Sequence, residues 1–232
     1  MGSFLDESAL TVAAANELNS PLVLLRQLGL IVGSDDISDE ERRRLGQQLT
    51  LTSERALRLV ANLNMTAVSP QLVPLEAINP VSICQQVIHE LAPLFVAHDQ
   101  MITLQPRTRV PLLVGNRQLL QRILLSFGDN ALHYGSATQP VHLSITSHGD
   151  RVRIGVRDYG PAVPNDMWQR LDGRVARRAQ APLGNRPHTS GVGLIAAKRL
   201  AELMDSVVGT IRHHDGATFY IDLRVSGQMS LL

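Results

Sequence analysis

The chain has 232 residues, and its 22 Lys and Arg against 21 Asp and Glu give a formal net charge of +1. This balance excludes a generally polybasic nucleic-acid-binding protein and an acidic tail protein. The length allows one large domain or two unequal ones. Aromatic residues make up only 3% of the chain, so we expect a core built from aliphatic side chains.

Cys84 is the single cysteine, which excludes an internal disulfide and a multi-cysteine zinc site and fits a reducing cytosol. Residues 1–10 have no basic region ahead of an apolar stretch, so they do not form a secretory signal. The apolar run that follows is interrupted at Arg26 and Gln27, well short of the ~20 residues that span a bilayer. We therefore expect a soluble, cytoplasmic protein without a membrane segment.

Residues 4–33 predict a long amphipathic helix, because apolar residues recur at steps of three and four. Pro21 lies inside this helix and should kink it or loosen its hydrogen bonds, at a cost of ~3 kcal/mol. A proline there indicates either a functional site or a tolerated kink. The apolar stripe consists of Leu18, Leu22, Leu25, Leu28 and Ile31.

A second helix is predicted from Ser38 to about Met65, after a turn at residues 33–36. Ser38 and Glu41 have the spacing of a capping box. Two antiparallel helices cannot bury both apolar stripes alone, so we expect residues 1–65 to form a four-helix bundle in a homodimer. Docking of the hairpin onto the rest of the same chain is the alternative.

Residues 66–74 contain Pro and Ser without periodicity and predict a linker. The remainder, 75–232, mixes helices and strands and predicts an α+β sandwich domain. The expected helices are 80–98, 118–134 and 191–204, and the expected strands are 101–104, 111–114, 141–146, 152–158 and 219–225.

Three short segments of this second domain carry residues with chemical potential. Asn130, on a predicted helix, offers an oxygen ligand of the kind Mg²⁺ prefers, or is an ordinary surface amide. Asp158 ends a predicted strand before Gly160, where its carboxylate could accept a hydrogen bond from the exocyclic amine of adenine or simply close a turn. Gly191 and Gly193 begin a helix, where backbone N–H groups can approach phosphate.

The glycines at 191 and 193 do not belong to a Walker A loop or to a Rossmann fingerprint, since no Gly-Lys-Ser/Thr follows and no strand precedes them. The preceding stretch, 173–188, carries four arginines and a histidine. These cations could clamp phosphate groups, and the stretch is equally compatible with an ordinary solvated loop.

Taken with a fourth segment on the first helix, these motifs resemble, in order and spacing, those of the sensor histidine kinases of two-component systems. Asn16–Leu22 resembles the box that holds the phospho-accepting His, and Ser126–Tyr134 resembles the N box. Asp158–Val163 is similar to the adenine-reading Asp-x-Gly-x-Gly box, and Gly191–Leu194 to the Gly-Leu-Gly-Leu box of the ATP lid. The resemblance covers nearly the whole chain.

The resemblance implies a fold and a reaction. The hairpin would dimerise, and an α/β sandwich of the Bergerat type, shared with gyrase and Hsp90, would bind ATP and Mg²⁺. In this family the γ-phosphate passes to a hairpin His and then to an Asp on the receiver domain of a response regulator. The sequence shows no sensor region, so the sensor could be a separate partner protein or a part of a longer protein that these residues do not include.

The resemblance also implies the residues of the nucleotide site, with Asn130 at the Mg²⁺-ligand position. Ser126, Ala162 and Thr189 replace family Asn or Gly residues, and these changes bear on nucleotide affinity more than on binding itself. Trp168 and Leu171 match the aromatic F box only weakly. The stretch 216–219 is similar to the family's final Gly-x-x-Phe. The implied nucleotide-binding residues are Ser126, Asn130, His133, Tyr134, Asp158, Gly160, Ala162, Gly191, Val192, Gly193 and Leu194.

Asn16 stands where the family has its phospho-accepting His, and the hairpin contains no His, the first being His89. A carboxamide nitrogen is not a nucleophile, so the chain should not autophosphorylate by the family's route. Glu17 remains at the general-base position, and Ser20 remains one turn beyond. Asn16 fits either a substitution that holds a state before transfer or a natural loss. The alternative functions are an ATP-gated scaffold and a response-regulator phosphatase in which Ser20 helps to place a water.

Overall fold

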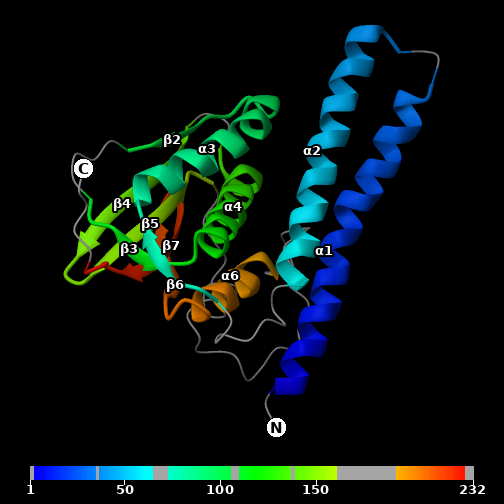
Figure 1. Cartoon of the computed structure of the whole chain (residues 1–232). Coiled ribbons are helices and arrows are strands. Elements are labelled where there is room, and N and C mark those ends of the chain that lie inside the picture. The colour runs from blue at the N-terminus through cyan, green and yellow to red at the C-terminus, as the bar shows by residue number, and fades with distance from the viewer. Residues whose placement is uncertain are drawn as a thin grey trace. The chain divides into compact units, whose positions relative to one another are not determined.

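The structure is a computed structural model that describes residues 3–34, 37–64, 73–105, 110–136, 139–160 and 192–227 (Figure 1). The predicted linker, 66–74, lies almost wholly outside these ranges. The chain divides into two compact units, one holding the two N-terminal helices and the other holding all the described strands. Within the described ranges, no helix has the length and apolar character needed to cross a bilayer.

The first unit is an antiparallel hairpin of helix α1, Ser3–Val32, and helix α2, Asp39–Asn64. The two helices pack against each other, and Pro21 lies inside α1 as expected. Leu28 of α1 and Ala56 of α2 are buried, which agrees with the predicted helices.

The turn between α1 and α2 is held by side-chain contacts with the backbone. The backbone N–H of Glu41 donates to Ser38 Oγ at 3.2 Å, so Ser38 caps α2 as its sequence position predicts. The Arg42 guanidinium donates to the carbonyl of Val32 and, at 3.2 Å, to that of Ser34. One side chain of α2 thereby satisfies carbonyls at the end of α1 that the helix itself leaves open.

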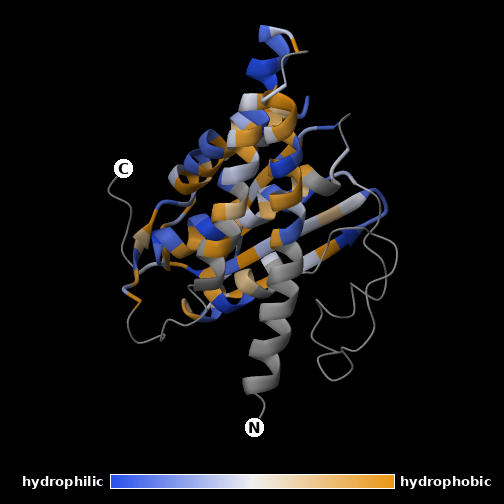
Figure 2. Ribbon diagram, turned by 90° about the vertical axis from the view of Figure 1, so that its right-hand side faces the viewer, coloured by the Kyte–Doolittle hydropathy of each residue, from blue (hydrophilic) through white to orange (hydrophobic). Residues whose placement is uncertain are grey.

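The hairpin leaves a large part of its apolar surface exposed. Leu22 and Ile31 belong to the predicted stripe but are 54% and 45% exposed, because one partner helix covers only part of a stripe. Figure 2 shows hydrophobic residues in orange on the described part of these helices. The exposed large apolar residues of the hairpin are Leu22, Val23, Leu24, Leu30, Ile31, Leu57 and Val60.

The second unit is built on a five-stranded sheet in the order β2-β4-β5-β7-β6. Strands β2 and β4 are parallel, and all other neighbours are antiparallel. The strands are β2 Ile102–Leu104, β4 Val141–His148, β5 Arg151–Asp158, β6 Val207–His213 and β7 Gly216–Arg224.

A second, two-stranded sheet pairs β1, Glu76–Ile78, with β3, Leu113–Gly115. Leu113 also bridges to Val225, directly after β7, which joins the small sheet to the large one. The sequence did not predict β1 or β6. Strand β1 has only three residues, and β6 is an edge strand whose exposure does not alternate, so neither has the period-two pattern that reveals a half-buried strand.

Helices α3 and α4 lie side by side over one face of the large sheet (Figure 1). Helix α3 is Pro80–Ala97, α4 is Arg117–Tyr134 and α6 is Val192–Glu202, all close to their predicted bounds. Alternate residues of β4, β5 and β7 are buried, and so is the facing side of each helix. The α+β class is confirmed, and the core is largely aliphatic as the composition indicates.

Both long helices of this unit begin at an asparagine cap. Asn79 Oδ1 accepts hydrogen bonds from the N–H groups of Val81 at 2.9 Å and Ser82 at 3.2 Å. Asn116 Oδ1 accepts from Leu119 N–H at 3.1 Å at the start of α4. These caps fix where α3 and α4 begin and therefore where their later residues lie over the sheet.

Candidate functional site

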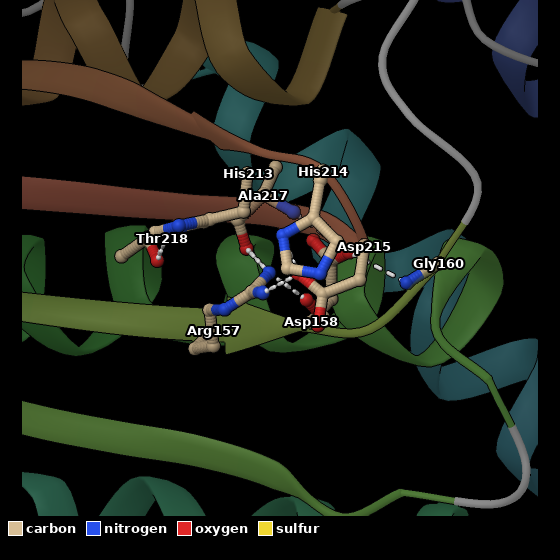
Figure 3. A network of polar contacts seen from close by, with 8 residues as sticks. All are labelled: Arg157, Asp158, Gly160, His213, His214, Asp215, Ala217 and Thr218. Atoms are coloured by element: carbon tan, nitrogen blue, oxygen red, sulfur yellow. Dashed lines mark hydrogen bonds and ion pairs between the residues drawn. The ribbon is translucent and has the colours of Figure 1, made fainter.

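Asp158 is a buried carboxylate at the end of β5, with 4% of its surface exposed. Its Oδ1 accepts hydrogen bonds from the backbone N–H of Gly160 and of Ala217, each at 3.2 Å (Figure 3). The register pairs Asp158 directly with Ala217 on β7. A buried carboxylate needs such donors, and two fixed N–H groups also give it a defined orientation.

Arg157 precedes Asp158 and lies on the opposite face of the sheet. Its Nη1 donates to the Asp158 carbonyl and, at 3.4 Å, to the Ala217 carbonyl (Figure 3). Its Nη2 meets Asp215 Oδ1 at 2.5 Å, and its guanidinium carbon lies 4.4 Å from the Tyr159 ring centroid. One side chain therefore joins the ends of β5 and β7 to the turn between β6 and β7.

Gly216 occupies the crowded point between these strands. Its φ of +139° lies in a region that residues with a Cβ rarely adopt. A Cβ on Gly216 would lie 2.2 Å from the Asp158 carbonyl oxygen and 2.7 Å from Arg157 Nη1. Glycine is thus required here for both conformation and space.

Charges at the β6–β7 turn shift the pKa values of two side chains, Asp215 and His213. Desolvation would raise the pKa of Asp215, but its hydrogen bond and charge interaction with Arg157 outweigh that effect and lower it below 3.8. Burial, assisted by the positive charge of Arg157, lowers the pKa of His213 below 6.5. His213 Nε2 also lies 2.9 Å from Thr218 Oγ1. At neutral pH the turn therefore holds a charged Asp215 beside a neutral His213.

Ser126 and Asn130 lie four residues apart on α4, on one side of the helix, and both are half-buried. Phe127, between them in sequence, is buried, and its ring centroid lies 6.0 Å from that of Phe219 on β7. Phe219 follows Ala217 by two residues along the strand. This aromatic contact sets the Ser126–Asn130 turn of α4 over the sheet near the strand end that carries Asp158.

The remaining predicted nucleotide residues are described in part or not at all. Gly193 is half-buried and Leu194 is buried, both in the first turn of α6. His133, Tyr134 and Val192 lie within helices whose backbone is described, without their side chains. The positions outside the described residues are Ala162, Trp168, Leu171, Thr189 and Gly191.

The predicted phosphotransfer residues lie on the other unit. Asn16 and Glu17 are in the body of α1, and the description there covers their backbone only. Ser20 follows one turn later with an exposed side chain, and Pro21 beside it is buried.

Sequence reasoning missed two contributors to the Asp158 environment, the Ala217 N–H and the Arg157 guanidinium. A backbone donor has no side-chain signature, and Ala217 is 59 residues from Asp158. In the sequence, Arg157 has the pattern of an ordinary outward-facing residue in an alternating strand. The available signal was Gly216, the first residue of β7, in the stretch 216–219.

The donor set suits a nucleotide with a hard cation. The amide oxygen of Asn130 and the hydroxyl of Ser126 are oxygen ligands, which Mg²⁺ prefers. The buried, oriented carboxylate of Asp158 suits an N–H donor such as an exocyclic amine. Separately, α6 begins with backbone N–H groups at a helix start, a feature that favours phosphate binding.

Comparison with known proteins gives one family for the second unit. Residues 115–227 match the family described as histidine kinase-, DNA gyrase B-, and HSP90-like ATPase. The adaptive-response sensory kinase SasA of Synechococcus sp. (strain CC9902) is 26% identical over 213 residues, covering 88% of this chain and 53% of SasA. The sensor protein kinase PmrB of Pseudomonas aeruginosa is 28% identical over 209 residues, covering 88% of this chain and 42% of PmrB. The chain thus spans about half the length of these relatives.

Solved structures share the fold. The structure of full-length ShkA in complex with AMPPNP matches with a TM-score of 0.63 at 19% identity. The match covers 96% of this chain and 47% of the ShkA chain. The histidine kinase ThkA, in complex with the response regulator TrrA, has a TM-score of 0.62 at 13% identity, covering 93% of this chain and 61% of its own. Residues 115–227 therefore form an ATPase domain of the family that histidine kinases share with gyrase B and HSP90, and the chain is similar in sequence to sensor histidine kinases over most of its length.

Proposed function

We propose that this chain is the phosphotransfer and ATP-binding core of a sensor histidine kinase whose first step is blocked at Asn16. The observation that carries the nucleotide half is the environment of Asp158, which is 4% exposed and held by two backbone N–H groups. A buried acceptor with a fixed direction discriminates strongly for a ligand that donates a hydrogen bond. The exocyclic amine of adenine is such a donor.

The phosphate end of the nucleotide would meet α4 and α6. Asn130 and Ser126 would offer oxygen ligands to Mg²⁺, and the first turn of α6 at Gly193 would offer backbone N–H groups to phosphate. When bound, Mg²⁺ supplies charge neutralisation for the triphosphate. The replacement of glycine by Ala162 and Thr189 would lower affinity without abolishing binding.

The phosphotransfer half of the proposal concerns Asn16. In the family reaction an imidazole nitrogen attacks the γ-phosphorus and ADP leaves, and an acid residue accepts the imidazole proton. Glu17 stands at that acid position, but Asn16 offers a carboxamide nitrogen whose lone pair is delocalised. The chain would bind ATP and dock the receiver domain of a response regulator without taking up phosphate. The complex of ThkA with a response regulator supports the choice of partner.

The exposed apolar surface of the hairpin supports assembly into a homodimer through residues 1–65. Seven large apolar side chains of α1 and α2 are 40% exposed or more in the single chain. A second hairpin packed on them would complete a four-helix bundle. We place the domain boundaries at 1–65, 66–74 and 75–232. We also place the chain in the cytoplasm, where ATP is supplied.

The decisive test is incorporation of label from γ-labelled ATP with Mg²⁺ into three versions of the chain: unchanged, Asn16→His and Asn19→His. Asn19 is the matched control, because it lies three residues beyond Asn16 on the same helix with its side chain exposed. We expect acid-labile label on Asn16→His alone, because only that change supplies a nucleophile at the family's acceptor position.

Other outcomes separate the alternatives. Absence of label on all three versions, with ATP bound, would contradict the kinase proposal. It would favour an ATP-gated scaffold or a response-regulator phosphatase, and the exposed Ser20 hydroxyl one turn beyond Asn16 favours the phosphatase of the two. Label on the unchanged chain would show that the acceptor is another residue.

A further inference from the structure

Two arginines on the outer face of β5 have nearly the same surroundings. Arg153 makes two 2.7 Å contacts with the Asp222 carboxylate and lies 3.6 Å from the Tyr220 ring centroid. Arg157, four residues further along the strand, is likewise paired with a carboxylate, that of Asp215, and lies against a tyrosine ring. Each arginine therefore has a carboxylate partner and a cation–π contact with a tyrosine, both of which stabilise a surface arginine.

Arg157 differs from Arg153 in its contacts with the backbone. Its Nη1 donates to the carbonyls of Asp158 and Ala217 (Figure 3). These are the two residues that are joined on the inner side by the hydrogen bond from Ala217 N–H to Asp158 Oδ1. Asp158 and Ala217 are thus held from both faces of the sheet. On the outer face Arg157 binds their two carbonyls, and on the inner face the Ala217 N–H donates to the Asp158 carboxylate.

The guanidinium is itself fixed. Asp215 holds Nη2 at 2.5 Å, and the Tyr159 ring covers one face of the group. Tyr159 in turn meets His142 edge-on, with ring centroids 6.0 Å apart. Only 15% of the Arg157 side chain is exposed, compared with 26% for Arg153. A shift of this arginine would move the peptide units that orient the Asp158 carboxylate.

We propose that Arg157 is a positioning residue for adenine recognition, which fixes the direction of the Asp158 carboxylate by holding the carbonyls of Asp158 and Ala217, with Asp215 holding the guanidinium in place. This inference rests on the proposed function, in which Asp158 accepts a hydrogen bond from adenine. The site would then depend on a group on the far face of the sheet that does not touch the nucleotide.

The inference predicts a selective loss. Without the guanidinium, the Asp158 peptide gains freedom, and its hydrogen bond to the exocyclic amine weakens. A misdirected hydrogen bond of a charged acceptor in a buried site corresponds to about a tenfold change in binding. Contacts of the triphosphate arise from α4 and α6, so they should stay as they are.

The experiment compares two probes by titration calorimetry on the full chain: ATP, and purine riboside triphosphate, which lacks only the exocyclic amine. The ratio of the two Kd values reports the hydrogen bond to Asp158. We expect Arg157→Ala to weaken ATP binding about tenfold and to leave the analogue unchanged, so that the ratio falls toward one. Arg157→Lys should restore only part of the preference, because an ammonium lacks the planar fork that reaches both the carbonyls and Asp215.

Arg153→Ala is the matched control, since it removes the same type of carboxylate and tyrosine contact from the same strand. It should lower thermal stability about as much as Arg157→Ala but leave the Kd ratio as in the unchanged chain. Asp215→Asn is a milder change and should reduce the Kd ratio by less than Arg157→Ala does. It provides the test if Arg157→Ala folds poorly.

Four results would overturn the inference. An unchanged Kd ratio in folded Arg157→Ala or Asp215→Asn would show that Arg157 does not position Asp158. An equal fall in Arg153→Ala would show a general effect of sheet stability. Lack of any ATP preference in the unchanged chain, or an Asp158→Ala variant that keeps the preference, would contradict adenine reading by Asp158 itself and identify the proposed function as the part that failed.

Discussion

At the scale of single residues, the space around Gly216 limits what the site tolerates. Its backbone lies against the Asp158 carbonyl and the Arg157 guanidinium, and its φ of +139° is open to glycine almost alone. Gly216 begins β7 directly after the turn 214–215, and its lack of a side chain lets β7 approach β5 closely at Asp158.

We predict that Gly216→Ala lowers the free energy of unfolding by about 2–4 kcal/mol, the sum of backbone strain and displacement of the Asp158 carbonyl. Denaturant titration followed by circular dichroism measures this change. Gly149→Ala is the control, because Gly149 also has a positive φ, +61°, but has nothing within 4 Å of the added Cβ. The control should cost about 1 kcal/mol, and equal losses in the two variants would contradict the steric argument.

The sequence predicted Asp158 and Asn130 but not the groups that orient Asp158. An Asp before a glycine at the end of an alternating strand is recognisable because its neighbours in sequence define it. Arg157 is recognisable only with the register of β5 and β7 known, since its partners Ala217 and Asp215 are far away in the chain. Residue patterns thus indicate candidate site residues, and long-range strand pairing shows which neighbours hold them in place.

At the scale of elements, the helix starts were the most predictable features. Pro80 in the first turn, with Asn79 before it, is a typical helix beginning, and the structure confirms α3 there. Strands β4 and β5 were predictable from strict alternation and an intervening turn. Strand β6 was not, because its outward residues and its edge position require no apolar period.

We predict that Asn79→Ala lowers the free energy of unfolding by about 1 kcal/mol, because the N–H groups of Val81 and Ser82 lose their acceptor. Chemical denaturation followed by circular dichroism gives the change. Asn79→Ser keeps a capping oxygen and should recover most of the loss. If the Ser and Ala variants were equally unstable, the cap would contribute nothing measurable to α3.

At the scale of the whole molecule, the division into a hairpin and a sheet unit was visible as a change from helical periodicity to mixed helix and strand patterns. The apolar stripe of α1 was predicted, but its partial exposure was not, because a stripe does not state which of its residues one partner helix will cover. Leu22 and Ile31 belong to the part of the stripe that α2 leaves exposed.

One chain has a mass of 25.4 kDa, and we predict that the protein sediments as a dimer of two such chains at micromolar concentration. Placing a charge on the apolar surface, with Leu22→Asp together with Leu57→Asp, should raise the dissociation constant more than tenfold, because both side chains are more than half exposed in the single chain. Analytical ultracentrifugation measures the effect. Ile211→Asp, an exposed apolar residue of the sheet unit, is the control and should leave the dimer intact.

The hydrogen bond between Asp158 and Ala217 also has a meaning during synthesis, because it joins residues 59 positions apart in the chain. At roughly 5–20 residues per second, the ribosome delivers Ala217 about 3–12 s after Asp158. Over that interval the carboxylate lacks its β7 donor, and Arg157 lacks Asp215. A chain synthesised only as far as β6 therefore cannot fix the Asp158 carboxylate, which becomes oriented only once β7 has been made and paired.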